Sequence, residues 1–101
     1  MDLKIDELNI SDVSHYKIST YNGFALKFII DDFRYNLFVK EMEDGVVRPV
    51  KVVHGDVNSH CKYCKKESYI CHKLMNYQQE LFHRLIEFPS IRLEWLYMNH
   101  V

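Results

Sequence analysis

The chain has 101 residues, of which 48% are apolar, and this is enough to build the core of one domain spanning residues 1–101. Its 13 Lys and Arg against 14 Asp and Glu give a net charge of −1, which argues against direct nucleic-acid binding through a generally basic surface. The sequence contains no run of about 18 apolar residues, the length needed for a membrane-spanning helix. The start, MDLKIDELN, is no secretory signal, so a cytoplasmic location is predicted.

Alternating apolar and polar residues in the first half of the chain predict an antiparallel meander of four to five strands. The strands are expected at 13–20, 24–30, 33–40 and 46–54. Residues 3–10 are expected to form a short strand or an irregular arm. Asn22–Gly23 and Glu43–Gly45 are hairpin signals, because their residues tolerate positive φ, and Asp31–Asp32 separates two strands. Pro49 predicts an edge strand or a bulge, because proline has no N–H to donate.

All three cysteines lie between His54 and His72, in the stretch HGDVNSHCKYCKKESYICH. Cys61 and Cys64 form a C-x2-C pair, which turns two thiolates toward one cation, and Cys71 follows seven residues later. A structural zinc ion takes four nitrogen or sulfur donors in a tetrahedron. A disulfide would leave one cysteine over, and buried free cysteines do not suit a segment that is polar because of its lysines, Lys62, Lys65 and Lys66.

The fourth zinc ligand is expected to be His54, which ends the apolar run of the last meander strand. His72 is the second candidate, but it directly follows Cys71, and adjacent helical residues point about 100° apart. His60 precedes the C-x2-C pair and would have to turn back on itself. The sequence therefore predicts a closed zinc knuckle with the ligands Cys61, Cys64, Cys71 and His54.

Apolar residues at steps of three and four predict one long helix, packed on the sheet, after the zinc segment. The stripe consists of Ile70, Leu74, Tyr77, Leu81, Leu85 and Phe88. Ser68 is the expected N-cap, and Pro89–Ser90 is expected to end the helix. The tail IRLEWLYMNHV begins with alternation and predicts a C-terminal strand, with a second short helix as the alternative. The predicted fold class is therefore α+β.

The sequence contains none of the common catalytic motifs, such as HExxH, a P-loop, GxGxxG or GxSxG. A zinc site rich in thiolates is usually closed, whereas a catalytic zinc ion keeps a position for water. Cys71 and His83 would lie about 18 Å apart along one helix, too far for a nucleophile and its base. The chain is therefore expected not to be an enzyme.

Two binding functions remain. In the first, the chain is an inhibitor or adaptor that occupies the surface of a partner protein, with aromatic anchors among Tyr16, Tyr21, Tyr35 and Trp95. In the second, the zinc knuckle contacts nucleic acid, with Tyr63 stacking on a base. The lysines of the knuckle would then bind phosphate: Lys62, Lys65 and Lys66.

With HCKYC…YICHKL as a zinc knot in a small, near-neutral α+β chain, the sequence resembles the compact phage-encoded anti-CRISPR proteins. One zinc-containing kind of these inhibits the type II RNA-guided DNA nuclease. The resemblance covers the size and make-up of the whole chain, and the cysteine cluster is its only motif. It implies a protein of the infected bacterial host cytoplasm that binds the CRISPR effector nuclease and blocks target-DNA loading or cleavage. No contact residues follow from it, and the chain is expected to be a monomer.

Overall fold

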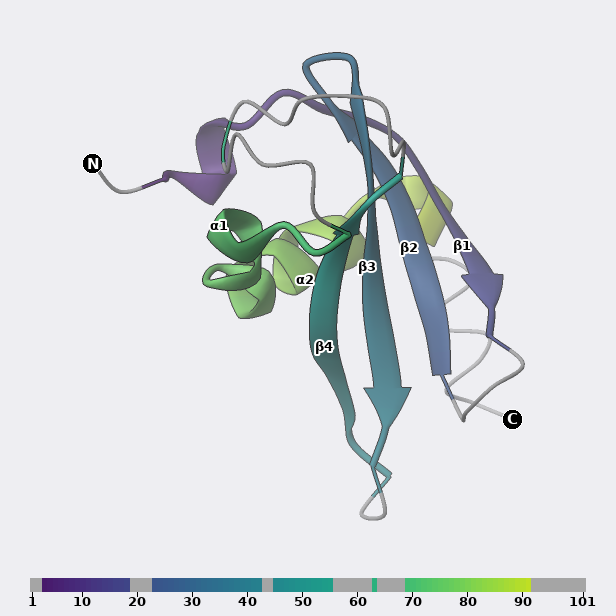
Figure 1. The fold of residues 1–101 in the computed structure, drawn as a ribbon. Helices are drawn as coiled ribbons and strands as arrows, with labels where there is room; N and C mark the ends of the chain where they lie inside the picture. The colour runs from purple at the N-terminus through teal and green to yellow at the C-terminus, as the bar shows by residue number, and fades with distance from the viewer. Residues whose placement is uncertain (1–2, 19–22, 43–44, 56–62, 64–68, 92–101) are drawn as a thin grey trace.

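The computed structural model describes residues 3–18, 23–42, 45–55, 63 and 69–91 (Figure 1). The elements are a 3-10 helix, η1 (Ile5–Glu7), the strands β1 (Ile10–Lys17), β2 (Gly23–Ile30), β3 (Phe33–Glu41) and β4 (Val47–His54), and the helices α1 (His72–Met75) and α2 (Gln78–Ile86). The strands form one antiparallel sheet in the order β1-β2-β3-β4. Both helices lie on the same side of it (Figure 1). The predicted α+β class and the meander are confirmed.

The predicted strand boundaries agree closely with the sheet. Strand β3 begins at its predicted residue, and β2 and β4 each begin within one residue of their own predicted starts. Strand β1 begins three residues before its predicted start. Asp31 and Asp32 form the two-residue turn between β2 and β3 with φ of 47° and 73°, as a type I′ hairpin requires. Pro49 lies in the edge strand β4, beside a register shift, as predicted. Residues 3–10, expected to form a short strand or an irregular arm, contain the 3-10 helix η1, and Ile10 begins β1.

The core lies between the sheet and the two helices. Leu26, Leu37 and Val52 are neighbours across three strands, and all are fully buried. Helix α2 covers this row with Leu81 and Leu85, which are also fully buried. Such burial of apolar side chains is the main source of stability in a sheet covered on one face by helices.

The predicted long helix is divided into α1 and α2, so this expectation is wrong. Tyr77, between the two helices, has φ −117° and ψ 19°, outside the helical region. The first helix also begins late, at His72, because Ile70 is extended and forms an isolated antiparallel bridge with Val53. The helical spacing still places most of the predicted stripe in the core, where three of its leucines are fully buried: Leu74, Leu81 and Leu85.

The predicted C-terminal strand was expected to begin at Ile91, but residues 89–91 are helical. Pro89 suits a first helical turn, because its φ is fixed near the helical value and its missing N–H is not needed there. At Ile91 the structure therefore agrees with the alternative prediction of a second short helix. Residues 92–101, the rest of the predicted strand, lie outside the described part of the chain. The predicted N-cap Ser68 lies outside it as well. Among the described helices, none has the length and apolarity needed to cross a membrane.

Candidate functional site

The end of β4 brings together two of the four predicted zinc ligands. Because Val53 pairs with Ile70, Cys71 lies opposite Val52, and its N–H donates to the carbonyl oxygen of Val52 over 2.9 Å. His54 is two residues further along β4 and therefore faces the same side of the sheet. Residues in this diagonal relation have Cα atoms about 7–8 Å apart, a separation that a thiolate and an imidazole bridge readily through one metal ion.

Both side chains are buried. Cys71 is fully buried, and His54 is only 8% exposed although it ends a strand. The backbone of His54 is fixed by a hydrogen bond from its N–H to the carbonyl oxygen of Tyr69, 2.9 Å long. Its ring lies 5.9 Å from the ring of Tyr35, centre to centre. A buried imidazole and a buried thiol on one side of the sheet are donor types that zinc accepts.

Tyr63, the second of the two residues between Cys61 and Cys64, also lies at this end of the sheet. The centre of its ring is 6.4 Å from that of Tyr35, and its side chain packs against the core. Tyr35 therefore contacts both His54 and the central part of the C-x2-C sequence.

The other predicted ligands, Cys61 and Cys64, lie outside the described residues, as does the alternative ligand His60. The second alternative, His72, is described and is exposed at the start of α1. Within the described ranges, no group of three or more His, Cys, Asp or Glu side chains is close enough to hold a metal ion. Two of the four predicted donors, Cys61 and Cys64, lie outside those ranges.

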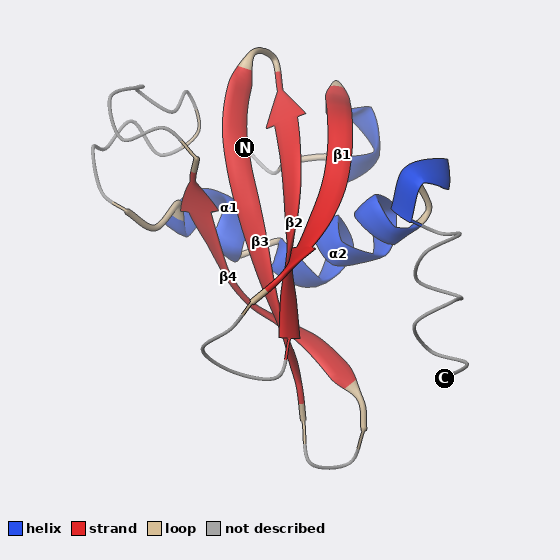
Figure 2. Cartoon of the chain, turned by 90° about the vertical axis from the view of Figure 1, so that its right-hand side faces the viewer, coloured by secondary structure: helices blue, strands red, loops and turns tan. Residues whose placement is uncertain are grey.

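A second feature was not predicted. The face of the sheet that turns away from α1 and α2 is here called the open face (Figure 2). The strand register places aromatic and basic side chains on it. One row across the four strands contains Tyr16, Ala25, Phe38 and Lys51. The next row contains Ser14, Lys27, Asn36 and Val53.

Lysines lie over the aromatic rings of the open face. The Nζ atom of Lys27 is 5.1 Å from the ring centre of Tyr16. The Nζ atom of Lys51 is 5.1 Å from the ring centre of Phe38 and 5.4 Å from that of Tyr69. These distances are typical of cation–π contacts. Burial raises the pKa of the Tyr16 hydroxyl, and the phenol of Tyr69 raises it further.

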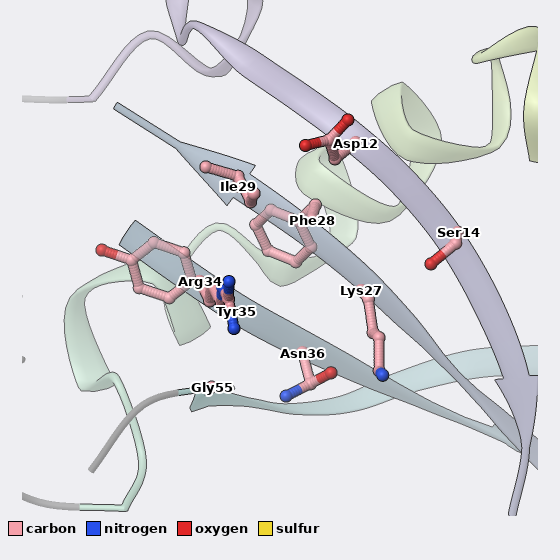
Figure 3. Close-up of a pocket in the computed structure, with 9 residues that line it drawn as sticks. All are labelled: Asp12, Ser14, Lys27, Phe28, Ile29, Arg34, Tyr35, Asn36 and Gly55. Carbon is pink, nitrogen blue, oxygen red and sulfur yellow. The ribbon is translucent and has the colours of Figure 1, made fainter. Parts of the chain in front are cut away.

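A cavity of about 300 Å³ opens beside these rows, between β1, β2 and β3 (Figure 3). Polar side chains from all three strands line it: Ser14, Lys27, Arg34, Asn36 and Asp12. Asp12 has φ 49° and lies where the pairing of β1 with β2 shifts register. The Oδ1 atom of Asn36 is buried and has no hydrogen-bond partner among the residues that the structure describes. A buried oxygen of this kind is suited to accept a hydrogen bond from a ligand.

The structure also places the aromatic anchors predicted for a protein interface. Tyr35 is only 1% exposed, so its prediction as a surface anchor is wrong; β3 turns its side chain into the core. Tyr16 is exposed on the open face. Tyr21 and Trp95 lie outside the described residues, as do the knuckle lysines Lys62, Lys65 and Lys66.

No protein-family model matches the chain, and no curated protein or solved structure is significantly similar to it.

Proposed function

We propose that the chain is a non-enzymatic binding domain that is stabilised by one structural zinc ion. Its ligands are Cys61, Cys64, Cys71 and His54. The observation that supports this best is the burial of His54 and Cys71 on one side of the sheet, where β4 pairs with the chain leading into α1. The contact of Tyr63 with Tyr35 adds support, because Tyr63 separates the other two ligands in the sequence.

The donor set fits zinc in its structural role. Three thiolates and one imidazole complete a tetrahedron, which leaves no position for a reactive water molecule. When bound, the ion would contribute its binding free energy to folding. Cys71 and His54 would then fix the connection between β4 and α1. This arrangement favours a domain that acts by binding over one that catalyses a reaction.

The proposed partner is a type II CRISPR effector nuclease, bound stoichiometrically so that target-DNA loading or cleavage is blocked. The resemblance to zinc-containing anti-CRISPR proteins is the support for this partner.

Mixing the purified chain with the guide-loaded nuclease tests the proposed partner. We expect the two to co-migrate on a sizing column and DNA cleavage to fall in proportion to the chain added. If a folded, zinc-containing chain shows neither effect, this partner is excluded. The proposed zinc site is not affected by that result.

A further inference from the structure

The charges of the open face differ from those of the chain as a whole. The chain carries a net charge of −1. Among the described residues, five basic side chains of the open face compare with one acidic side chain, a local balance of +4 for these six groups: Lys27, Arg34, Lys40, Arg48, Lys51 and Asp12. Such segregation creates a surface that attracts polyanions even though the total charge is near zero.

We propose that the open face binds single-stranded nucleic acid. This goes beyond the proposed function, since it concerns a different surface from the zinc site and does not depend on the nuclease. It also differs from the expectation based on total charge, because the sheet gathers basic residues that are far apart in the sequence.

The aromatic rings would supply the contacts to bases. Tyr16 and Phe38 lie in one row across the sheet, separated by Ala25, and Tyr69 lies beside Lys51. Bases of a single strand stack on such rings whatever their sequence, because every base has a π-face. The lysines that now lie over the rings are within reach of the phosphates that a stacked strand would bring with it.

The cavity would hold a phosphate together with part of its nucleotide. Ser14, Lys27 and Asn36 are neighbours across β1, β2 and β3, so a hydroxyl, an ammonium and an amide group line one side of it (Figure 3). Arg34 adds a guanidinium, which matches phosphate oxygens with two parallel donors. The Oδ1 atom of Asn36, which has no hydrogen-bond partner within the described part of the chain, would accept a hydrogen bond from a base amino group.

The combination of rings and cations favours a single strand over other polyanions. A DNA duplex keeps its bases stacked on one another and is read by an element that enters a groove, whereas the described part of this face is a sheet. An acidic protein would use the cations but leave the rings Tyr16, Phe38 and Tyr69 without a stacking partner.

Fluorescence anisotropy with a labelled oligouridylate of about 15 nucleotides tests the proposal on the intact, zinc-loaded chain. We expect binding at about 50 mM salt, with a negative salt slope of about 0.7 for each phosphate contact. The double variant Lys27→Gln, Lys51→Gln should reduce the slope by about 1.4 and the affinity at least tenfold. Phe38→Ala should weaken binding and leave the slope unchanged, because it removes stacking alone.

Lys73→Gln is the matched control. The Nζ atom of Lys73 lies 5.8 Å from the ring centre of Tyr77, so this variant removes the same kind of contact and the same charge, but from α1. Its binding should equal that of the unchanged chain. The melting temperature and zinc content of every variant identify any that fail to fold, and Lys51→Arg, which keeps the charge, should retain binding.

Three results would overturn the proposal. The first is no binding to the oligonucleotide at about 50 mM salt. The second is an equal loss of binding in Lys73→Gln and in the open-face variants. The third is tighter binding to polyglutamate than to oligouridylate, which would assign the open face to an acidic protein.

Discussion

Val53 and Ile70 form an antiparallel bridge that joins the edge strand β4 to the chain leading into α1. This one pairing has two consequences. It keeps the residues before His72 extended, so the helix begins there, and it sets Cys71 on the same side of the sheet as His54. The candidate zinc site and the late start of the predicted helix therefore have a common structural cause.

Replacement of the two buried donors should remove the metal. We expect Cys71→Ser and His54→Ala each to abolish bound zinc and to lower the free energy of unfolding by more than about 4 kcal/mol, because metal binding at such a site contributes directly to folding. His72→Ala, the control on the exposed neighbour, should keep both properties. Elemental analysis and chemical denaturation measure them. Equal zinc content in all three variants would exclude the proposed ligand set.

Gly55→Ala should disturb the start of the segment that follows β4. A Cβ atom at this position would lie 2.9 Å from the Cβ atom and 3.1 Å from the carbonyl carbon of Arg34, closer than packed atoms normally come. The N–H of Gly55 also donates to the carbonyl oxygen of Arg34 over 2.8 Å, so the backbone has little freedom to withdraw. We expect a loss of about 1–3 kcal/mol in denaturant unfolding.

Gly45→Ala is the comparison for Gly55→Ala. Nothing lies within 4 Å of a Cβ atom at Gly45, but its φ is +82°. Its cost should come from backbone conformation alone, about 1 kcal/mol, and Gly45→Asn should recover part of that cost because asparagine tolerates positive φ. If Gly55→Ala is as stable as the unchanged chain, the close approach to Arg34 is not a constraint.

Leu37→Ala should destabilise the core by about 2–5 kcal/mol, because it leaves a cavity between Leu26 and Val52 under the helices. Ile29→Ala, on the half-buried open face, should cost clearly less. Urea unfolding of the two variants compares them. Similar losses would mean that the open face is covered as fully as the core.

Alkaline titration tests the effect of Tyr69 on the ionisation of Tyr16. Burial, and then Tyr69, raise the pKa of Tyr16 above its ordinary value of 10.0. An acid with a raised folded-state pKa stabilises the fold below its unfolded-state pKa, and this contribution is lost as the pH rises through the folded-state value. Tyr16→Phe should therefore make the loss of stability above about pH 10 less steep.

Tyr69→Phe is the companion variant in that titration. It should lower the pH at which Tyr16 ionises, seen by phenolate absorbance as the difference from the Tyr16→Phe spectrum. An unchanged titration of Tyr16 in this variant would show that the two hydroxyls do not interact.

The sequence was sufficient to predict the sheet, because β2 and β3 alternate with a period of two and the turn at Asp31–Asp32 marks their junction. It was not sufficient for the helix. The periodicity of the stripe continues through Ile70, but pairing of Ile70 with β4 overrides its helical spacing. Local preference is weak compared with such tertiary contacts.

The open face could not be predicted from the sequence, for a different reason. Tyr16 meets Lys27, and Phe38 meets Lys51, only through the register of separate strands. In β1 that register depends on the shift at Asp12, and a slip of one residue would turn Tyr16 to the other face. The strand pattern alone contains no signal for that shift.

The central claim is that one zinc ion stabilises this domain, and the most direct measurement is the melting temperature of the purified chain with and without a strong chelator, together with its metal content. We predict one zinc ion per chain, and a large fall in melting temperature when the ion is removed that is reversed by added zinc. A metal-free chain whose melting temperature does not respond to the chelator or to added zinc would contradict the account.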